Sequence, residues 1–578
     1  MLESQKNMAR PQALPTVRFI AKTRKFLTTL LLCLILTAAF SIIIQIKPAS
    51  ATTRNVPANY PTIQAAIDAA LAGDVIQVAL GTYREHLDVA KSLTIVGANS
   101  LTTIIDGMSN GTVILLEATT ITITGFTIRN AGNSYTAVTA EDIVAANDYH
   151  IIKNNIIRDC TNGVSIGSSS YDTIVGNTFI NNSITGIILS SATNTNITGN
   201  TISQSAYGIK LASSTTNTIA SNVMSAIGAY GIYLSSTSTG NTITRNSISA
   251  RSAGIYITSD NNSVDHNTVS QSDFGIYFYN CINGPIYYNY LYNNSRGIRL
   301  YSTSPYSSSA TVRNNKATYN TWGIELISTS STTFTGNWLQ RNTWGVSISS
   351  AAYNTFYHND FVNNIVQATS DSLDYWNTTT DGNYWSDYTG GGKYPIIPGY
   401  DYHPLKTTWS EHDIAIQSVT TSANQAVSGS IINITIKVTN NANITVSETF
   451  TVTAKYNSTI IGTQQVTNLT KGATQTLTFN WNTAGITGKY IISTVASTVT
   501  DELNTDNNQF TDGTVKILYL GDINQDGTVN LADLTLFNQS YGSTLGQLNW
   551  NPNADLNKDN IINALDLFIL SKNYGKSS

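Results

Sequence analysis

The chain has 578 residues, of which only 11% are charged, and its net charge is −4. A chain of this length is expected to fold as several domains. The low charge, with abundant Asn, Ser and Thr, argues against a helical protein and favours β-structure with a neutral polar surface. Because no basic run occurs after the N-terminal segment, nucleic acid is excluded as an expected partner.

The N-terminus has the pattern of a secretory signal. Basic residues precede an apolar run from Phe26 to Ile46, and a segment of small residues ends at Ala51. This pattern predicts a signal peptide over residues 1–51, and therefore a secreted or cell-surface protein. Since the apolar run is long for a signal, an uncleaved membrane anchor is the alternative, and it would be the only contact with a membrane.

A repeat of about 22 residues occupies residues 150 to 362. One phrase of the repeat is Ile152-Ile-Lys-Asn155, and its Asn occurs ten times in phase. A second phrase, such as Gly231-Ile-Tyr-Leu, alternates apolar and polar residues, which predicts strands. Such a repeat without helical segments predicts a parallel β-helix whose coils stack at about 4.8 Å. We expect the Asn to form a hydrogen-bonded ladder at one corner, in left-handed backbone, and the Gly to mark another corner.

Two cysteines follow the N-terminal segment, Cys160 and Cys281. They stand more than five coils apart in the repeat, which corresponds to roughly 25 Å at the ladder spacing. A disulfide requires Cα atoms within about 7 Å of each other. We therefore expect both cysteines to be small buried residues that do not bond to each other.

The segment before the repeat contains Pro61-Thr-Ile-Gln, Gly73-Asp-Val-Ile and Gly81-Thr-Tyr. Together with the repeat and the stretch from Tyr353 to Gly392, it resembles the pectin-lyase-like right-handed β-helix proteins, and more closely the NosD-like family of secreted β-helices. This resemblance implies a mainly β-protein that begins with a right-handed parallel β-helix of about 10 to 13 coils over residues 52–408, closed by an N-terminal capping helix.

Some related β-helices are polysaccharide lyases or hydrolases, which need carboxylates gathered on one face. In the repeat the acidic residues each stand alone at their phase, and Glu325 is expected to form a surface ion pair with Arg299. We therefore assign no catalytic residue and favour a non-enzymatic β-helix, with a polysaccharide lyase or O-glycosyl hydrolase as the alternative. His266 and His358 would lie about 19 Å apart, so no copper site is expected.

Aromatic side chains recur at one outward position of the repeat. Two residues after the Gly stand Tyr233, Tyr256 and Tyr277 on successive coils, preceded by Lys210 and followed by Arg299. Flat aromatic ladders suit the C–H faces of sugars, and the flanking cations suit acidic sugars. We predict a face for a polysaccharide or cell-surface glycan here. The alternative is that Tyr is simply favoured at exposed strand positions.

Residues 411–518 have a different pattern, with alternating strands at short spacing that predict a β-sandwich. The phrases Asp413-Ile-Ala-Ile, Phe479-Asn-Trp481 and Asn504-Thr-Asp-Asn resemble the CARDB family of immunoglobulin-like adhesion modules. This resemblance implies a spacer or an adhesion role.

Residues 519–578 contain two copies of an acidic loop, each leading into an apolar-periodic helix, at Leu531 to Tyr541 and at Ala564 to Tyr574. Oxygen-bearing residues stand at the ligand positions of a calcium loop, which predicts two calcium ions. Thr528 and Ile561 would each ligate through the backbone carbonyl. The predicted ligands are Asp522, Asn524, Asp526, Thr528, Asn530 and Asp533 in the first loop, and Asp555, Asn557, Asp559, Ile561, Asn563 and Asp566 in the second.

Two such loops, with no helix entering the first, resemble a type I dockerin, the module that attaches secreted proteins to cohesin-bearing scaffolds. The resemblance implies a cohesin-like partner, contacted at Leu531, Ala532, Ala564 and Leu565. Many dockerins carry small hydroxyl residues at these positions, which leaves the partner open. Calcium is expected to fold this small domain, because it buries little core alone.

Taken together, these features predict a secreted polysaccharide-binding or adhesive rod that is tethered through a calcium-dependent dockerin. The alternative is an enzyme of polysaccharide catabolism within a cellulosome-like complex. A third possibility is a purely structural surface-layer protein.

Overall fold

The computed structural model describes residues 51–140, 148–235, 237–303 and 310–577. The expected signal peptide therefore lies outside the described residues, apart from Ala51. Within these ranges, no helix has the length and apolar character needed to cross a membrane.

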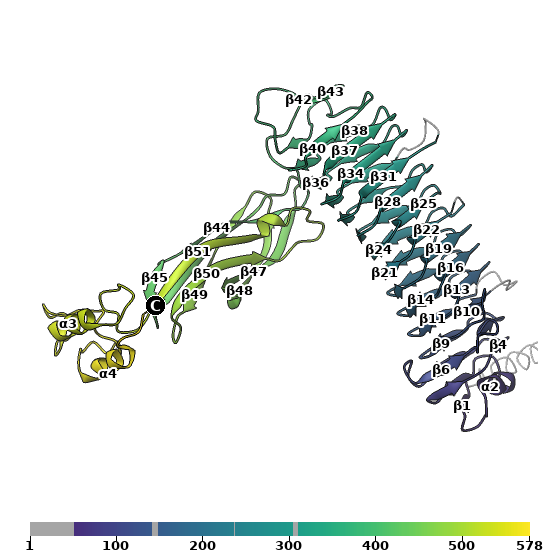
Figure 1. The fold of residues 1–578 in the computed structure, drawn as a ribbon, viewed down its shortest axis with the longest axis horizontal. Helices are drawn as coiled ribbons and strands as arrows, with labels where there is room; N and C mark the ends of the chain where they lie inside the picture. Colours follow the sequence, from purple (N-terminus) through teal and green to yellow (C-terminus); the bar gives the residue numbers. More distant parts are fainter. Residues whose placement is uncertain (1–50, 141–147, 236, 304–309, 578) are drawn as a thin grey trace, which may run out of the picture.

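The N-terminal part is a parallel β-helix that forms a long rod (Figure 1). In each coil the chain passes through three sheets, here called A, B and C, which contain 14, 14 and 13 parallel strands. The expected fold class, a β-helix followed by a sandwich and a small helical domain, is confirmed.

The strands of the β-helix are short and follow the sheets in a regular order. Sheet A contains β1 (Thr53–Val56), β2 (Val75–Val78), β5 (Thr94–Gly97), β8 (Thr122–Thr124), β11 (Ile151–Lys153), β14 (Thr173–Val175), β17 (Asn196–Thr198), β20 (Thr218–Ala220), β23 (Thr242–Thr244), β26 (Ser263–Asp265), β29 (Ile286–Tyr287), β32 (Thr311–Arg313), β35 (Thr333–Thr335) and β38 (Thr355–Tyr357). Sheet B contains β3 (Gly81–Tyr83), β6 (Thr103–Asp106), β9 (Thr127–Arg129), β12 (Ile156–Arg158), β15 (Thr178–Ile180), β18 (Thr201–Ser203), β21 (Val223–Ile227), β24 (Ser247–Ala250), β27 (Thr268–Ser270), β30 (Tyr290–Tyr292), β33 (Lys316–Thr318), β36 (Trp338–Gln340), β39 (Asp360–Val362) and β41 (Tyr384–Trp385). Sheet C contains β4 (Leu87–Val89), β7 (Ile114–Leu116), β10 (Thr136–Ala140), β13 (Asn162–Gly167), β16 (Thr185–Ser190), β19 (Tyr207–Ala212), β22 (Tyr230–Leu234), β25 (Ala253–Ile257), β28 (Phe274–Tyr279), β31 (Arg296–Tyr301), β34 (Trp322–Ile327), β37 (Trp344–Ser349) and β40 (Val366–Thr369).

Both ends of the apolar core are covered. At the N-terminal end lies the capping helix α2 (Ile63–Ala69), which begins after Thr62 and buries Ile63 and Ile67. At the other end, a hairpin of β42 (Tyr394–Ile396) and β43 (Gly399–Asp401) follows the last coils. There the ring of Tyr394 stacks on Trp385, with 4.2 Å between the ring centroids. These caps keep the open ends of the coil stack away from water.

The predicted Asn ladder lies at the corner between sheets A and B. Asn289 is typical, because its Oδ1 accepts hydrogen bonds from the backbone N–H and the Nδ2 of Asn267, at 2.9 and 3.1 Å. The left-handed residue, however, is the one before the ladder Asn, since Tyr288 has a φ of 55°. The expectation that the Asn itself is left-handed was therefore wrong. The buried members of this ladder are Asn155, Asn177, Asn200, Asn222, Asn246, Asn267, Asn289, Asn315, Asn337, Asn359 and Asn383.

Two further ladders, which were not predicted from the sequence, lie at the other corners. At the corner between sheets B and C, Asn342 Oδ1 accepts hydrogen bonds from the N–H and the Nδ2 of Asn320, at 2.9 and 3.1 Å. At the corner between sheets C and A, Asn241 Oδ1 accepts from the N–H and the Nδ2 of Asn217, at 2.9 and 3.0 Å. Each ladder pairs buried amides that would otherwise destabilise the fold.

The repeated Gly was expected to mark a corner, and this expectation was wrong. Gly254 lies inside β25, where an added Cβ would come within 2.1 Å of Val269 Cγ1 and 2.9 Å of Gly275 O. Glycine is therefore used for close approach of the backbone to the adjacent coil, rather than for a turn. The two cysteines are free and buried, as expected.

The next part is a β-sandwich of two sheets around Trp481 and other buried apolar residues. One sheet contains β44 (Ile414–Thr421), β46 (Ile431–Asn440) and β49 (Thr474–Asn482). The other contains β45 (Gln425–Val427), β51 (Gln509–Leu518), β50 (Gly488–Ala496), β47 (Ser447–Tyr456) and β48 (Thr459–Thr470). A short 3-10 helix, η1 (Asp506–Asn508), precedes β51, and the chain then ends with helices α3 (Leu531–Ser540) and α4 (Ala564–Asn573).

Direct contacts join the β-helix to the sandwich. Lys316 Nζ donates a hydrogen bond to Leu503 O at 2.6 Å, and Gln340 Nε2 donates to Asp506 Oδ2 at 3.1 Å. Lys316 and Gln340 both belong to sheet B, so these contacts do not involve sheet C. In Figure 1 the sandwich accordingly lies beside β36 and β24, and helices α3 and α4 lie beyond its far end.

Candidate polysaccharide face and calcium loops

The outer face of sheet C carries a continuous set of aromatic and charged side chains, here called the belt. Strand alternation places Tyr256 outward between the buried Ile255 and Ile257 of β25. Tyr233, Tyr256 and Tyr277 are directly paired in register on neighbouring strands. The belt runs from β19 to β37 and consists of Tyr207, Lys210, Tyr230, Tyr233, Tyr256, Phe274, Tyr277, Tyr279, Arg296, Arg299, Tyr301, Trp322, Glu325 and Trp344.

The rings of the belt stack on one another along the rod. Tyr233 and Tyr256 have ring centroids 5.4 Å apart and planes 12° from parallel, and Tyr256 and Tyr277 are 5.1 Å and 29° apart. Rings that lay side by side in one plane would clash at these distances, so neighbouring faces must overlap. The belt thus differs from the flat platform that the sequence suggested, because its rings are partly covered by each other and turn edges towards solvent.

The hydroxyl groups of the belt tyrosines are available for a ligand. Among the described residues, none of these seven hydroxyls has a hydrogen-bond partner, and none is a buried unpaired atom. Burial raises the pKa of Tyr230, Tyr256 and Tyr277, so that these phenols remain protonated donors at neutral pH. The belt therefore presents phenol groups at the coil spacing of about 4.8 Å.

The cations of the belt are held over its rings. The expected ion pair is confirmed, with Arg299 Nε 3.1 Å from Glu325 Oε2, and Arg296 Nε lies 2.7 Å from the same oxygen. The Arg299 guanidinium also lies 5.2 Å from the ring centroid of Tyr277, and Lys210 lies 5.5 Å from that of Tyr207. Two guanidinium groups share one carboxylate, so the face keeps a positive charge although the chain is acidic overall.

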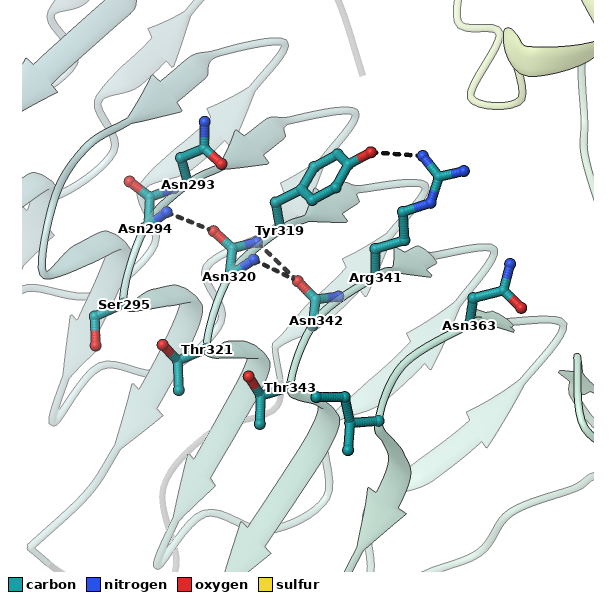
Figure 2. A pocket seen from close by; sticks show the side chains of 11 residues that line it. Asn293, Asn294, Ser295, Tyr319, Asn320, Thr321, Arg341, Asn342, Thr343 and Asn363 are labelled. Carbon is teal, nitrogen blue, oxygen red and sulfur yellow. Dashed lines mark hydrogen bonds between the residues drawn. The ribbon is translucent and has the colours of Figure 1, made fainter.

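A groove of about 740 Å³ adjoins the belt at the corner between sheets B and C (Figure 2). Figure 2 shows the amides of the second Asn ladder between two rows of side chains, with Tyr319 and Arg341 in one row and Thr321 and Thr343 in the other. Thr321 and Thr343 directly precede two belt residues in the chain. This groove was not predicted from the sequence, although an exposed Tyr or Arg directly before an Asn that recurs one coil later was a visible signal.

In the C-terminal part, each predicted calcium loop is closed by the Asp at its last position. Asp533 Oδ1 accepts hydrogen bonds from the N–H groups of Ile523 and Asn524 at 2.7 and 3.1 Å, and its Oδ2 accepts from Asn530 N at 2.8 Å. Asp566 makes the same three kinds of bond in the second loop. Asn530 and Asn563 cap the helices that follow. The helices begin at the expected residues and end one residue earlier than expected.

The remaining loop residues fit calcium chemically. In the part of the chain that the structure describes, no three His, Cys, Asp or Glu side chains are grouped as a metal site. The loops nevertheless bring Asn amides beside their carboxylates, since Asn524 Nδ2 donates to Asp526 Oδ2 and Asn557 Nδ2 donates to Asp559 Oδ2, both at 2.8 Å. A set of ligands made only of oxygens is the one that calcium prefers. Asp522 Oδ1 is buried without a hydrogen-bond partner, and burial raises the pKa of this carboxyl group. A bound cation would satisfy that oxygen.

The residues expected to contact a cohesin-like partner are all exposed. Leu531 is 66% exposed and Leu565 is 61% exposed, which is high for apolar side chains. Phe568, one helical turn after Leu565, is 58% exposed and was missed in the sequence analysis. The spacing of three residues between Leu565 and Phe568 was the signal that could have placed both on one face of α4.

Protein-family models match segments of the β-helix, the sandwich and the C-terminal domain. The description "Periplasmic copper-binding protein (NosD)" matches residues 83–250, and "Right handed beta helix region" matches residues 227–366. CARDB matches residues 411–512, and the dockerin type I domain matches residues 520–574. The chain joins a right-handed β-helix of the NosD type to a CARDB domain and a type I dockerin domain. No curated protein matches the sequence.

Several solved structures are similar to parts of this chain. The CARDB domain of a Pyrococcus furiosus protein, in complex with di-metal ions, is 24% identical over 20% of this chain and 99% of its own, with a TM-score of 0.17. The A-module of an Azotobacter vinelandii mannuronan C-5 epimerase is 15% identical over 54% of this chain and 92% of its own, with a TM-score of 0.41. The catalytic domain of a GH87 alpha-1,3-glucanase in complex with nigerose is 13% identical over 59% of this chain and 70% of its own, with a TM-score of 0.37.

Proposed function

We propose that this protein is an extracellular polysaccharide-binding rod that attaches to a cohesin-type partner through its dockerin domain. In this proposal residues 52–408 form the binding rod, residues 411–518 form a spacer and residues 519–578 form the calcium-dependent attachment domain. The signal pattern of residues 1–51 supports an extracellular or cell-surface location.

The observation that carries the binding role is the belt on sheet C. Its phenol hydroxyls lack partners among the described residues, and they recur at a spacing similar to the length of a sugar unit in an extended chain. Hydroxyl groups and guanidinium groups can donate to sugar oxygens, while the exposed ring edges exclude water from one side of the polymer. A polysaccharide lying along the rod would therefore meet the same contacts on successive coils.

The attachment role rests on the type I dockerin match and on the exposed apolar residues of α3 and α4. Calcium held by the two loops would fix the helices that carry Leu531, Ala532, Ala564 and Leu565. The oxygens available for the first ion are those of Asp522, Asn524, Asp526 and Asp533 and the carbonyl of Thr528. Asn530, the remaining predicted ligand of this loop, also caps helix α3, where its Oδ1 accepts a hydrogen bond from Ala532 N at 2.7 Å. The second loop offers the equivalent set.

The experiment that tests this function measures retention and cleavage together. The full chain is applied to a panel of neutral and acidic polysaccharides, and reducing ends and unsaturated products are measured in the same samples. Retention without product formation supports a binding rod. Product formation that is lost on boiling would instead establish the enzymatic alternative, and neither retention nor product would leave a structural role.

A further inference from the structure

We infer that the groove between sheets B and C is a subsite for an anionic group, a carboxylate or a sulfate ester, of an acidic polysaccharide that lies on the belt. This inference rests on the proposed function, and it adds a ligand class and a second set of contacts. The rim side chains that the argument uses are Asn293, Tyr319, Thr321, Arg341, Thr343 and Asn363.

Arg341 is the cation that gives the groove its preference for an anionic group. Its Nη1 donates a hydrogen bond to the hydroxyl of Tyr319 at 2.5 Å, and its guanidinium lies 5.6 Å from the ring centroid of that residue. Within the described residues it forms no ion pair, so most of its five N–H donors have no protein partner. A guanidinium in this position can bind a carboxylate or a sulfate through two parallel hydrogen bonds.

The backbone holds Arg341 at the edge of the groove. Tyr319 and Arg341 occupy the same corner position on neighbouring coils, each in left-handed backbone with φ values of 56° and 54°. Asn363 follows one coil later, and its backbone also has a positive φ, of 53°. Figure 2 shows these three side chains projecting on the same side of the Asn ladder, which places an aromatic ring, a cation and an amide in a row.

The floor of the groove cannot supply the contacts to a ligand. Asn320 Nδ2 donates to Leu291 O at 3.0 Å and to Asn342 Oδ1 at 3.1 Å, and Asn342 Nδ2 donates to Ala317 O at 2.9 Å. These amides are buried and already hydrogen-bonded in the ladder. A ligand must therefore be held by the rim, where the groups free to donate are the Arg341 guanidinium, the exposed amides and the threonine hydroxyls.

The charges around the groove favour an anion. No acidic residue lines it. The acidic residues around it are already engaged or lie further along the rod. Glu325 pairs with Arg296 and Arg299, Asp506 Oδ2 accepts a hydrogen bond from Gln340 at 3.1 Å, Asp387 Oδ1 accepts one from Gln367 at 3.2 Å, and Asp273 lies one coil beyond the groove. Beside the groove, Arg296 adds positive charge, because Arg296 and Arg299 share the single carboxylate of Glu325, which balances only one of them. A neutral glycan would use the belt but would leave the Arg341 guanidinium without a counter-charge.

The continuity of the groove with the belt allows one polymer to use both. Thr321 and Thr343 are followed directly by Trp322 and Trp344, whose rings stack with centroids 5.1 Å apart. Successive rim positions are one coil apart, about 4.8 Å, so neighbouring sugar units would meet neighbouring rim side chains. An anionic group on the polymer would thereby reach Arg341 while the sugar rings remain on the belt.

The test uses the full chain with Arg341→Gln and the matched control Arg245→Gln. Both arginines are exposed and both have a φ of 54°, but Arg245 lies at the corner between sheets A and B. The probes are polygalacturonate, its carboxyl-reduced neutral form and dextran sulfate. We expect Arg341→Gln to weaken binding to an anionic probe by about tenfold, the size of one charge-assisted hydrogen bond, and to leave the neutral probe unchanged. Arg245→Gln should leave the binding of both kinds of probe unchanged, and Arg341→Lys should retain part of the affinity for the anionic probes.

The outcomes separate this inference from the proposed function. If Arg341→Gln weakens binding to polygalacturonate alone, the ligand group is a carboxylate. If it weakens binding to dextran sulfate alone, the ligand group is a sulfate ester. Binding that Arg341→Gln leaves unchanged, or weakens equally for the neutral probe, overturns the subsite while the binding role of the belt stands. If the unaltered chain binds none of the probes, nor any other polysaccharide of the panel, the proposed function and the subsite both fail.

Discussion

The rings of Tyr233 and Tyr256 stack across two coils of sheet C, with centroids 5.4 Å apart and planes 12° from parallel. The same relation continues to Tyr277, so that each ring partly covers its neighbour. Stacked in this way, the tyrosines strengthen the rod and expose their edges and hydroxyls. The phenol group, rather than the ring face, is then the part of each tyrosine that a ligand meets.

Tyr256→Phe tests this use of the hydroxyl. The variant keeps the stacked ring, and should therefore keep the melting temperature, while losing about 0.5–1.5 kcal/mol of polysaccharide binding, the net contribution of one hydrogen bond. Isothermal titration and thermal unfolding would be measured side by side. The control is Tyr171→Phe, whose ring stacks on Tyr149 at 5.3 Å outside the belt. Equal affinity of the Tyr256→Phe variant and the unaltered chain would mean that this hydroxyl does not contact the ligand.

The Asn ladder at the corner between sheets A and B should contribute strongly to stability. In Asn289→Ala, the N–H and the Nδ2 of Asn267 lose their shared acceptor, and a buried unpaired group costs about 1–3 kcal/mol. We expect a clearly lower midpoint of chemical denaturation. Asn196→Ala, at an exposed position in β17, is the matched control and should have little effect. If both variants unfold at the same denaturant concentration, the ladder is not a major source of stability.

The sequence predicted the Asn ladder between sheets A and B, but not which residue at that corner has the left-handed backbone. Periodicity identified Asn289 and its equivalents, because one residue type recurs in phase. Periodicity could not show that the preceding Tyr288 makes the turn, since residues of many types occur there, among them Gly199, Arg245 and His358, and all of them have positive φ. Likewise Gly254 was assigned to a corner, although its role is a close approach between coils that only the packed structure reveals.

The candidate sites were predictable to different degrees. The calcium loops follow a fixed local spacing, so Asp522 and Asp533 could be named from the sequence. The column of Tyr233 and its neighbours could also be named, because the repeat fixes the register. The groove beside Arg341 could not be found in this way, because it depends on how corner residues of successive coils project. The contacts of Lys316 with the sandwich join segments 187 residues apart, and no local pattern encodes them.

The sandwich should become more stable as the pH falls towards 5. Burial is the largest influence on Glu502 and raises its pKa from 4.5 to about 7, although Ile414 N and Asn508 Nδ2 donate hydrogen bonds to it. In the unfolded chain this carboxyl group loses its proton at lower pH than in the folded chain. Its stabilising contribution is thus complete below about pH 4.5 and is lost as the pH rises through about 7.

Thermal unfolding of the unaltered chain and of Glu502→Gln, measured at several pH values between 5 and 8, checks this dependence. The difference in melting temperature between the two proteins should change over this range, because Gln cannot ionise. A difference that stays constant with pH would show that Glu502 does not titrate in the folded protein.

Calcium removal should affect the C-terminal part selectively. With a chelator, α3 and α4 should lose helical signal while the β-helix and the sandwich keep their β-signal, because the loops hold the helices in place. Asp522→Ala should lower the number of calcium ions bound from about two to about one, as measured by titration calorimetry. Asp512→Ala, an exposed position in β51, is the control. Unchanged helical signal without calcium would contradict the role of the metal in folding.

The most direct test of the central claim is the retention of the full chain on immobilised polysaccharides, compared with a triple variant in which Tyr233, Tyr256 and Tyr277 are each replaced by Ala. Our account predicts that the unaltered chain is retained by at least one polysaccharide of the panel, and that the triple variant elutes early although it is folded and still binds calcium. Equal retention of the two proteins would contradict a binding role for the belt.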